Sequence, residues 1–170
     1  MRILIADDDL TSRAMLAGVL KKGGHEVVEA VNGIEALERL KEADAPKLVI
    51  VDWVMPEMDG MEVVRRVRAM QTEMPPYFIM LTSKGEKADI IAGLEAGADD
   101  YLSKPFDTGE LRARVEVGRR LVERQEILAA KIAELNQALG EIKTLRGIVP
   151  ICASCKKIRD DKGFWQQVEV

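Results

Sequence analysis

The sequence predicts an α/β fold, a doubly wound, five-stranded parallel sheet followed by an extended C-terminal helix. Three observations indicate it. Short apolar, partly β-branched runs recur with starts 22 to 29 residues apart, helix-like periodicity fills each gap, and a long proline-free segment follows the last run. Strand, helix and strand at this spacing predict right-handed crossovers and a parallel sheet covered by helices on both faces.

The five apolar runs are the expected strands. They are Ile3–Ala6, Glu26–Ala30, Leu48–Val51, Tyr77–Leu81 and Asp99–Leu102. Apolar stripes mark the intervening helices, such as Leu16, Val19 and Leu20 in the first gap, and a fourth helix is expected over Gly85–Ala96. The uninterrupted apolar character of the first and third runs fits strands that are buried on both sides.

A second pattern begins after Asp107, where some forty helix-favouring residues run without proline up to Pro150. Apolar and partner positions alternate at spacings of 4 and 3 residues, as in a coiled coil. They are Leu121, Gln125, Leu128, Ile132, Leu135, Leu139, Ile142 and Arg146. We therefore expect one globular domain over residues 1–120, a coiled-coil helix over 121–147 that forms a homodimer, and a short tail over 148–170. The alternative is one amphipathic helix folded back on its own domain.

Composition narrows the class of protein. With 170 residues, 47% hydrophobic and 32% charged, the chain suits a globular domain with an appendage. The net charge of −4 gives no general attraction to nucleic acid or to an anionic membrane. Because we find neither an apolar stretch of roughly 18 residues nor a signal peptide, the sequence predicts a cytoplasmic protein without a membrane association.

Carboxylates follow two of the expected strands. Asp7 and Asp8 come directly after the first, and Asp52 closes the third. Ligand sites of open parallel sheets form at the carboxyl ends of the strands, so these side chains should lie together. Hard carboxylate oxygens without histidine or cysteine favour Mg²⁺. The alternative is that Asp7 to Asp9 only cap the following helix.

Two further strand ends add polar groups. Thr82 follows the fourth strand and Lys104 the fifth, so a hydroxyl donor and an ammonium group should reach the same edge. Phosphoryl transfer requires mainly positioning and charge neutralisation, which a carboxylate nucleophile, a metal, a hydroxyl and a lysine together supply. Each residue alone has another explanation, Thr82 as a strand-end cap and Lys104 as a solvated charge.

Four runs resemble the receiver domains of bacterial two-component response regulators. They are Ile3-Leu-Ile-Ala-Asp-Asp-Asp, Val49-Ile-Val-Asp-Trp-Val-Met-Pro-Glu-Met-Asp-Gly60, Met80-Leu-Thr-Ser and Tyr101-Leu-Ser-Lys-Pro-Phe106. The resemblance covers about residues 1–120 and implies a flavodoxin-like fold. It also implies that a sensor histidine kinase donates a phosphoryl group to Asp52, forming an aspartyl phosphate.

The same resemblance assigns roles to the site residues. It places Asp8 on the Mg²⁺ directly and Asp7 through water, with the backbone carbonyl of Val54 as a further ligand. Thr82 would move towards the phosphoryl group and Lys104 would pair with it. Tyr101 matches the aromatic residue of the switch that turns inward on activation.

The resemblance also implies a signalling protein instead of an enzyme, apart from its part in its own phosphorylation and dephosphorylation. Because the long helix starts beside the switch surface, we expect phosphorylation to alter the pairing of the coiled coil. The segment after residue 120 carries no basic recognition helix, so direct DNA binding is not expected.

The tail contains the only two cysteines, Cys152 and Cys155, at the spacing of half a zinc site or of a redox pair. The segment is similar to a small Cys-x-x-Cys-Lys-Lys-Ile-Arg module of bacterial signalling proteins in which a second cysteine pair follows, and that pair is absent here. Zn²⁺ binding, including a site shared by two copies, a redox pair, and an inert or unfinished tail all remain open.

Two other functions compete with the signalling interpretation. The segment from Asp7 to Asp9 also fits the start of the haloacid-dehalogenase-like phosphatase signature, with Asp7 as nucleophile and Asp9 as acid/base. That interpretation leaves Asp52 without a role. A phosphate-independent dimerisation module is the other alternative, and the complete acidic, hydroxyl and lysine set disfavours it.

Overall fold

The computed structural model describes residues 1–72, 74–83, 95–146, 158–159 and 165–166. They belong to two compact units, Met1–Glu126 and Ile127–Val170. The predicted helix over Gly85–Ala96 falls almost wholly outside the described residues, and both cysteines of the tail do so as well.

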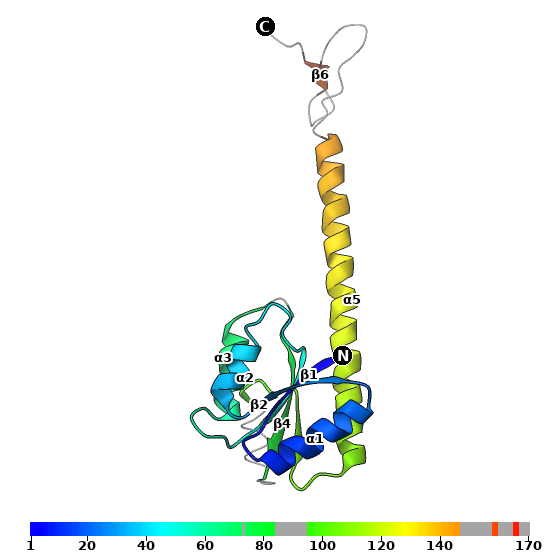
Figure 1. Cartoon of the computed structure of the whole chain (residues 1–170). Coiled ribbons are helices and arrows are strands. Elements are labelled where there is room, and N and C mark those ends of the chain that lie inside the picture. The colour runs from blue at the N-terminus through cyan, green and yellow to red at the C-terminus, as the bar shows by residue number, and fades with distance from the viewer. Residues whose placement is uncertain (73, 84–94, 147–157, 160–164, 167–170) are drawn as a thin grey trace. The chain divides into compact units, whose positions relative to one another are not determined.

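The first unit alternates strands and helices, as Figure 1 shows in chain order. The elements are β1 (Arg2–Ala6), α1 (Leu10–Lys22), β2 (Glu26–Ala30), α2 (Gly33–Arg39), β3 (Leu48–Asp52), α3 (Gly60–Ala69), β4 (Tyr77–Thr82), β5 (Asp100–Ser103) and α5 (Thr108–Arg146), whose residues after Glu126 belong to the second unit. In the second unit, β6 (Ile158–Arg159) and β7 (Trp165–Gln166) form an antiparallel pair. All five strands that the sequence predicts for the first unit are present, with ends that differ by one residue at most.

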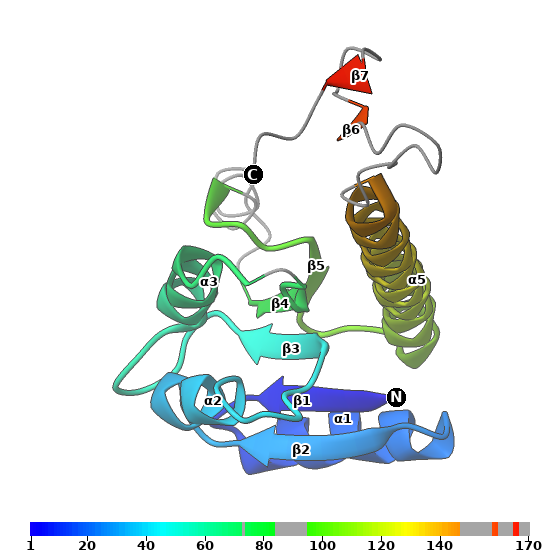
Figure 2. The ribbon, with the colours of Figure 1, turned by 90° about the horizontal axis from the view of Figure 1, so that it is seen from above.

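The five strands of the first unit make a parallel sheet in the order β2-β1-β3-β4-β5. Figure 2 shows these strands side by side. The chain passes from β1 to β2 on one side and returns to β3 on the other side of β1. This reversal creates a switch point at the carboxyl ends of β1 and β3, the place where open parallel sheets typically bind ligands.

The core lies on both faces of this sheet, because alternate residues of each buried strand point to opposite faces. On one face, Val49 and Phe78 pack with Val63 and Val64 of α3 and with Leu37 of α2. The other face brings strand residues together with α1 and with the first turns of α5. Its members include Ile5, Ile50, Leu16, Leu111 and Val115. The doubly wound fold predicted from the sequence is therefore confirmed.

Helix α5 is longer than the segment that covers the sheet. It begins at Thr108 and continues without a break through Arg146. Leu111, Val115 and Val122 are buried, whereas Leu128 and Leu135 are 62% and 59% exposed. None of the described helices is both long and apolar enough to cross a membrane.

Candidate functional site

The three predicted carboxylates meet at the switch point. One carboxylate oxygen from each of Asp7, Asp8 and Asp52 lies within 4.8 Å of the others. Asp7 is fully buried, Asp52 is 9% exposed and Asp8 is exposed. Two unit charges at that separation repel by roughly 3.5 kcal/mol at an effective dielectric of 20. The fold therefore needs positive charge at this edge of the sheet.

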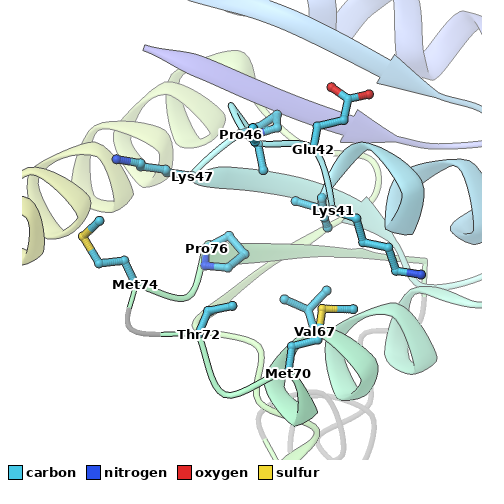
Figure 3. Close-up of a pocket in the computed structure, with 12 residues that line it drawn as sticks. Lys41, Glu42, Pro46, Lys47, Val67, Met70, Thr72, Met74 and Pro76 are labelled. Atoms are coloured by element: carbon cyan, nitrogen blue, oxygen red, sulfur yellow. The ribbon is translucent and has the colours of Figure 1, made fainter.

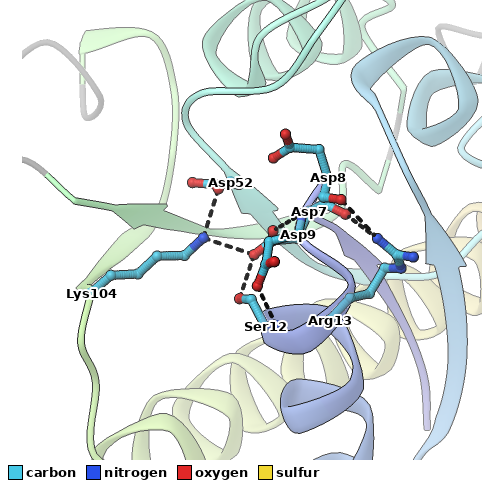
Figure 4. Close-up of polar contacts among 7 residues, drawn as sticks. All are labelled: Asp7, Asp8, Asp9, Ser12, Arg13, Asp52 and Lys104. Carbon is cyan, nitrogen blue, oxygen red and sulfur yellow. Dashed lines mark hydrogen bonds and ion pairs between the residues drawn. The ribbon is translucent and has the colours of Figure 1, made fainter.

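Lys104 supplies part of that charge from the residue after β5. Its Nζ lies 2.8 Å from Asp7 Oδ2 and 2.6 Å from Asp52 Oδ2, so the ammonium group bridges two strand ends (Figure 4). Three carboxylates and one ammonium group together carry a formal charge of −2. A divalent cation has the matching charge, and an all-oxygen donor set suits a hard one.

Burial also changes the acidity of the paired groups. It raises the pKa of Asp52 above 3.8, the hydrogen bond and charge of Lys104 oppose this, and the charge of Asp7 adds to it. For Lys104, burial alone would lower the pKa, but the hydrogen bonds and charges of Asp52 and Asp7 together raise it above 10.5. Lys104 thus stays protonated at neutral pH. The Asp52 carboxylate is more basic than a solvated one, which favours it as a nucleophile.

The loop that carries Asp7 and Asp8 is fixed by Arg13 of α1. The Arg13 guanidinium is buried and donates from Nη1 to the backbone carbonyl of Asp7 at 2.7 Å and to that of Asp8 at 3.4 Å. Its Nε lies 3.5 Å from Glu29 Oε2 on β2. Sequence reasoning missed Arg13. The available signal was an arginine in the first turns of the helix that directly follows the acidic run.

Asp9 has a different role from its two neighbours. It is the N-cap of α1, and its side chain accepts a hydrogen bond of 2.7 Å from the amide of Ser12. The Asp9 amide donates to Asp7 Oδ1 at 2.9 Å, and the Ser12 hydroxyl donates to Asp7 Oδ2 at 2.6 Å. The capping alternative is therefore correct for Asp9, while Asp7 and Asp8 join the carboxylate cluster. Ser12 is a second residue that sequence reasoning missed.

Asp52 is held at the end of β3 by a tight loop. The Gly60 amide donates to the Trp53 carbonyl at 3.0 Å, and the Trp53 amide donates to the Leu81 carbonyl at 2.9 Å. A Cβ atom on Gly60 would lie 2.2 Å from the Asp52 carbonyl oxygen. Only glycine permits this approach, so Gly60 fixes the path of the chain immediately after the carboxylate.

The remaining predicted residues surround the cluster on neighbouring strands. Thr82 ends β4, one residue beyond the pair formed by Asp52 and Leu81, and is 2% exposed. Tyr101 on β5 is half-buried, with the Arg114 guanidinium 5.4 Å from its ring centroid. Val54 follows Asp52 in the β3–α3 loop with its side chain exposed. Their roles in metal binding and switching stay predictions.

A surface pocket of about 430 Å³ lies elsewhere, between the loops that lead into β3 and β4 (Figure 3). Its lining includes Pro46, Val67, Met70 and Pro76, and none of the clustered carboxylates. The loops at the amino ends of these strands form it, whereas the carboxylates lie at the carboxyl ends. The carboxylate cluster is thus separate from this pocket.

Known proteins share this fold. Residues 3–116 match the family described as the response regulator receiver domain. The chain is 39% identical over 117 residues to the chemotaxis protein CheY homolog of Campylobacter jejuni, covering 68% of this chain and 90% of that protein.

Two further matches agree. The alkaline phosphatase synthesis transcriptional regulatory protein PhoP of Bacillus subtilis is 35% identical over 150 residues, covering 85% of this chain and 60% of that protein. The solved structure of the Francisella response regulator 1452 receiver domain superposes with a TM-score of 0.65 at 30% identity, covering 72% and 97% of the two chains. The chain therefore belongs to the family of response regulator receiver domains, which accept a phosphoryl group on an aspartate.

Proposed function

We propose that Asp52 is the phosphate acceptor of this receiver, with Lys104 and Thr82 as the residues that stabilise the transferred group. One observation carries the proposal: Lys104 Nζ bridges Asp7 and Asp52 at the rim where three carboxylates converge. Of the two carboxylates that Lys104 contacts, Asp7 is fully buried, whereas Asp52 is 9% exposed. Asp52 is therefore the better placed of these two to meet a phosphodonor.

Receiver domains bind Mg²⁺ at an aspartate cluster of this kind, and the residues present here fit it. Asp8 and Asp52 would hold the cation directly, Asp7 through water, and the Val54 carbonyl would complete the protein ligands. When bound, Mg²⁺ supplies positive charge that neutralises the phosphoryl oxygens.

The protein's own residues then perform the transfer. A carboxylate oxygen of Asp52 attacks the phosphorus of a phosphohistidine, a P–O bond forms and the P–N bond breaks. The bonding electrons return to the imidazole nitrogen of the kinase. Lys104 leaves the Asp52 carboxylate to pair with the phosphoryl oxygens, since that group carries about −1.5 to −2 charge. This is the sense in which the chain takes part in its own phosphorylation.

Signal output follows from two neighbouring side chains. Thr82 would donate its hydroxyl to a phosphoryl oxygen, and Tyr101 would turn into the space that this movement leaves. Tyr101 already contacts Arg114 of α5. A change at Tyr101 therefore has a direct path to the helix that continues to Arg146.

We further propose that the receiver, assigned to residues 1–120, signals through a parallel homodimer of the helix over 121–147. Apolar side chains at the coiled-coil spacing are exposed, among them Leu128, Ile132 and Leu135 at 62%, 51% and 59%. Phosphorylation would alter the pairing of this helix.

The sensor histidine kinase is the proposed phosphodonor, since receivers interact with such kinases.

A cytoplasmic location and the lack of direct DNA binding stay predictions from the sequence. So does Zn²⁺ binding by Cys152 and Cys155, which metal analysis of the purified protein would check.

The experiment is intact-protein mass spectrometry after incubation with acetyl phosphate, with and without Mg²⁺. We expect one phosphoryl group on the wild type that depends on Mg²⁺, and none on Asp52→Asn. The phosphatase alternative, with Asp7 as nucleophile, finds no support in the family match. It would be revived if Asp52→Asn still became phosphorylated while Asp7→Asn did not.

A further inference from the structure

Ser12 occupies the first turn of α1 with two separate contacts. Its amide donates to Asp9, which caps the helix, and its hydroxyl donates to Asp7 Oδ2 at 2.6 Å. Replacing the side chain by alanine would remove the second contact and keep the first, because the cap uses the backbone amide. The contribution of the hydroxyl can therefore be separated from that of the helix.

Asp7 is surrounded by donors on both carboxylate oxygens. Oδ1 accepts from the Asp9 amide at 2.9 Å, while Oδ2 accepts from Ser12 and from Lys104 Nζ at 2.8 Å. The residue is fully buried. An ionised carboxylate offers about four lone-pair positions, so these three donors fix the plane of the group and leave it little further capacity.

The three donors to Asp7 differ in whether they also serve another group. The Asp9 amide belongs to the backbone, and Lys104 is shared with Asp52 at 2.6 Å. In the proposed phosphotransfer, Lys104 turns to the phosphoryl oxygens. The Ser12 hydroxyl, which donates to Asp7 Oδ2 (Figure 4), is not shared with Asp52 and would hold that oxygen both before and after Lys104 turns.

We propose that Ser12 is a positioning residue of the metal site, whose hydroxyl sets the orientation in which Asp7 meets the Mg²⁺ shell. The inference rests on the proposed function, since it assigns Asp7 to the Mg²⁺ site. Residues that hydrogen-bond to direct metal ligands typically contribute about 10- to 100-fold to metal affinity. Because Asp7 would hold the Mg²⁺ through water, we expect the lower end of this range for Ser12.

The test is isothermal titration of the whole protein with Mg²⁺, in the absence of any phosphodonor. Ser12→Ala should weaken Mg²⁺ binding by about tenfold, and Ser12→Thr, which keeps a hydroxyl, should bind as the wild type does. Thr11→Ala is the matched control, because Thr11 is exposed at the preceding helical position. Acetyl phosphate labelling of the wild type, measured separately, checks the proposed function independently of Ser12.

The possible failures are distinguishable. Wild-type affinity or tighter binding in Ser12→Ala would overturn the role of Ser12 and leave the acceptor role of Asp52 intact. Equal weakening in Thr11→Ala would also overturn it, since the loss would then come from the helix. If the wild type bound no Mg²⁺ and formed no acyl phosphate, the proposed function would fail first and this inference with it.

Discussion

At the scale of single residues, the site pairs buried carboxylates with an ammonium group, and burying either kind of charge without its partner would be unfavourable. Asp7 and Asp52 are both buried, and each lies within 2.8 Å of the same ammonium nitrogen. Burial of a charge is tolerated only when it is paired and hydrogen-bonded. Lys104 neutralises these two carboxylates in the metal-free protein, and a bound cation would do the same. The charge of Lys104 therefore affects both the stability of the metal-free protein and its affinity for a cation.

Lys104→Met should lower the free energy of unfolding by about 2 kcal/mol without Mg²⁺. Removing one partner of a fully buried pair costs about 3–5 kcal/mol, and partial exposure of Lys104 reduces this. Adding Mg²⁺ should restore part of the loss, because the cation replaces the missing charge. Urea unfolding with and without Mg²⁺ measures both effects.

Lys47→Met is the control for that variant. Lys47 pairs with Glu126, and both side chains are more than 40% exposed, so the expected loss is below about 1 kcal/mol with no effect of Mg²⁺. Equal losses in both variants would contradict the account of Lys104.

Asp52→Asn should raise the free energy of unfolding at neutral pH. The pKa of Asp52 is raised in the folded protein, chiefly by burial. The unfolded chain therefore loses its proton first, and this group's contribution to stability falls as pH rises from 3.8 up to the folded pKa. Asparagine does not titrate, so it adds no pH dependence to the free energy of unfolding. The extra stability of the variant over the wild type should therefore vanish as pH falls towards 3.8. Thermal unfolding across pH without Mg²⁺ tests this, and a variant less stable than wild type at pH 7 would contradict it.

At the scale of elements, strands were the most predictable feature. Continuous apolar, β-branched runs such as Leu48–Val51 are typical of strands that are buried on both faces of a parallel sheet. Their ends placed Asp7, Asp52, Thr82 and Lys104 at one rim, because parallel strands share their carboxyl edge.

Ser12 and Arg13 could not be predicted in the same way. Their partners are a carboxylate oxygen and two backbone carbonyls of the preceding loop. Such contacts depend on how the first turn of α1 is rotated against the end of β1. Hydrophobic periodicity gives the buried face of a helix and does not fix this rotation to within a hydrogen bond.

The proposed coiled coil yields a prediction for α5. Leu135→Lys places a charge at a d position and should raise the dimer dissociation constant by at least about tenfold. Ala133→Lys adds the same charge outside the seam and should leave the dimer unchanged. Analytical ultracentrifugation distinguishes them, and a wild type that stays monomeric at every concentration would refute the dimer.

At the scale of the whole molecule, the unit Met1–Glu126 contains every described residue of the proposed phosphorylation site. The sequence was sufficient for the sheet, its helical layers and the carboxylate cluster, since these follow from patterns repeated along the chain. The domain limits near residues 120 and 147 stay predictions, because α5 passes through the first without a break. Within a continuous helix, no turn or helix-breaking residue marks the point at which the domain core ends.

Every role proposed for the carboxylate cluster depends on Asp52 being the residue that carries the transferable phosphoryl group. Reductive trapping tests it directly: borohydride converts an aspartyl phosphate to homoserine, and peptide sequencing by mass spectrometry locates the changed residue. After treatment with acetyl phosphate and Mg²⁺, homoserine should appear at position 52 and at no other aspartate. Homoserine at position 7, or none anywhere, would contradict the account.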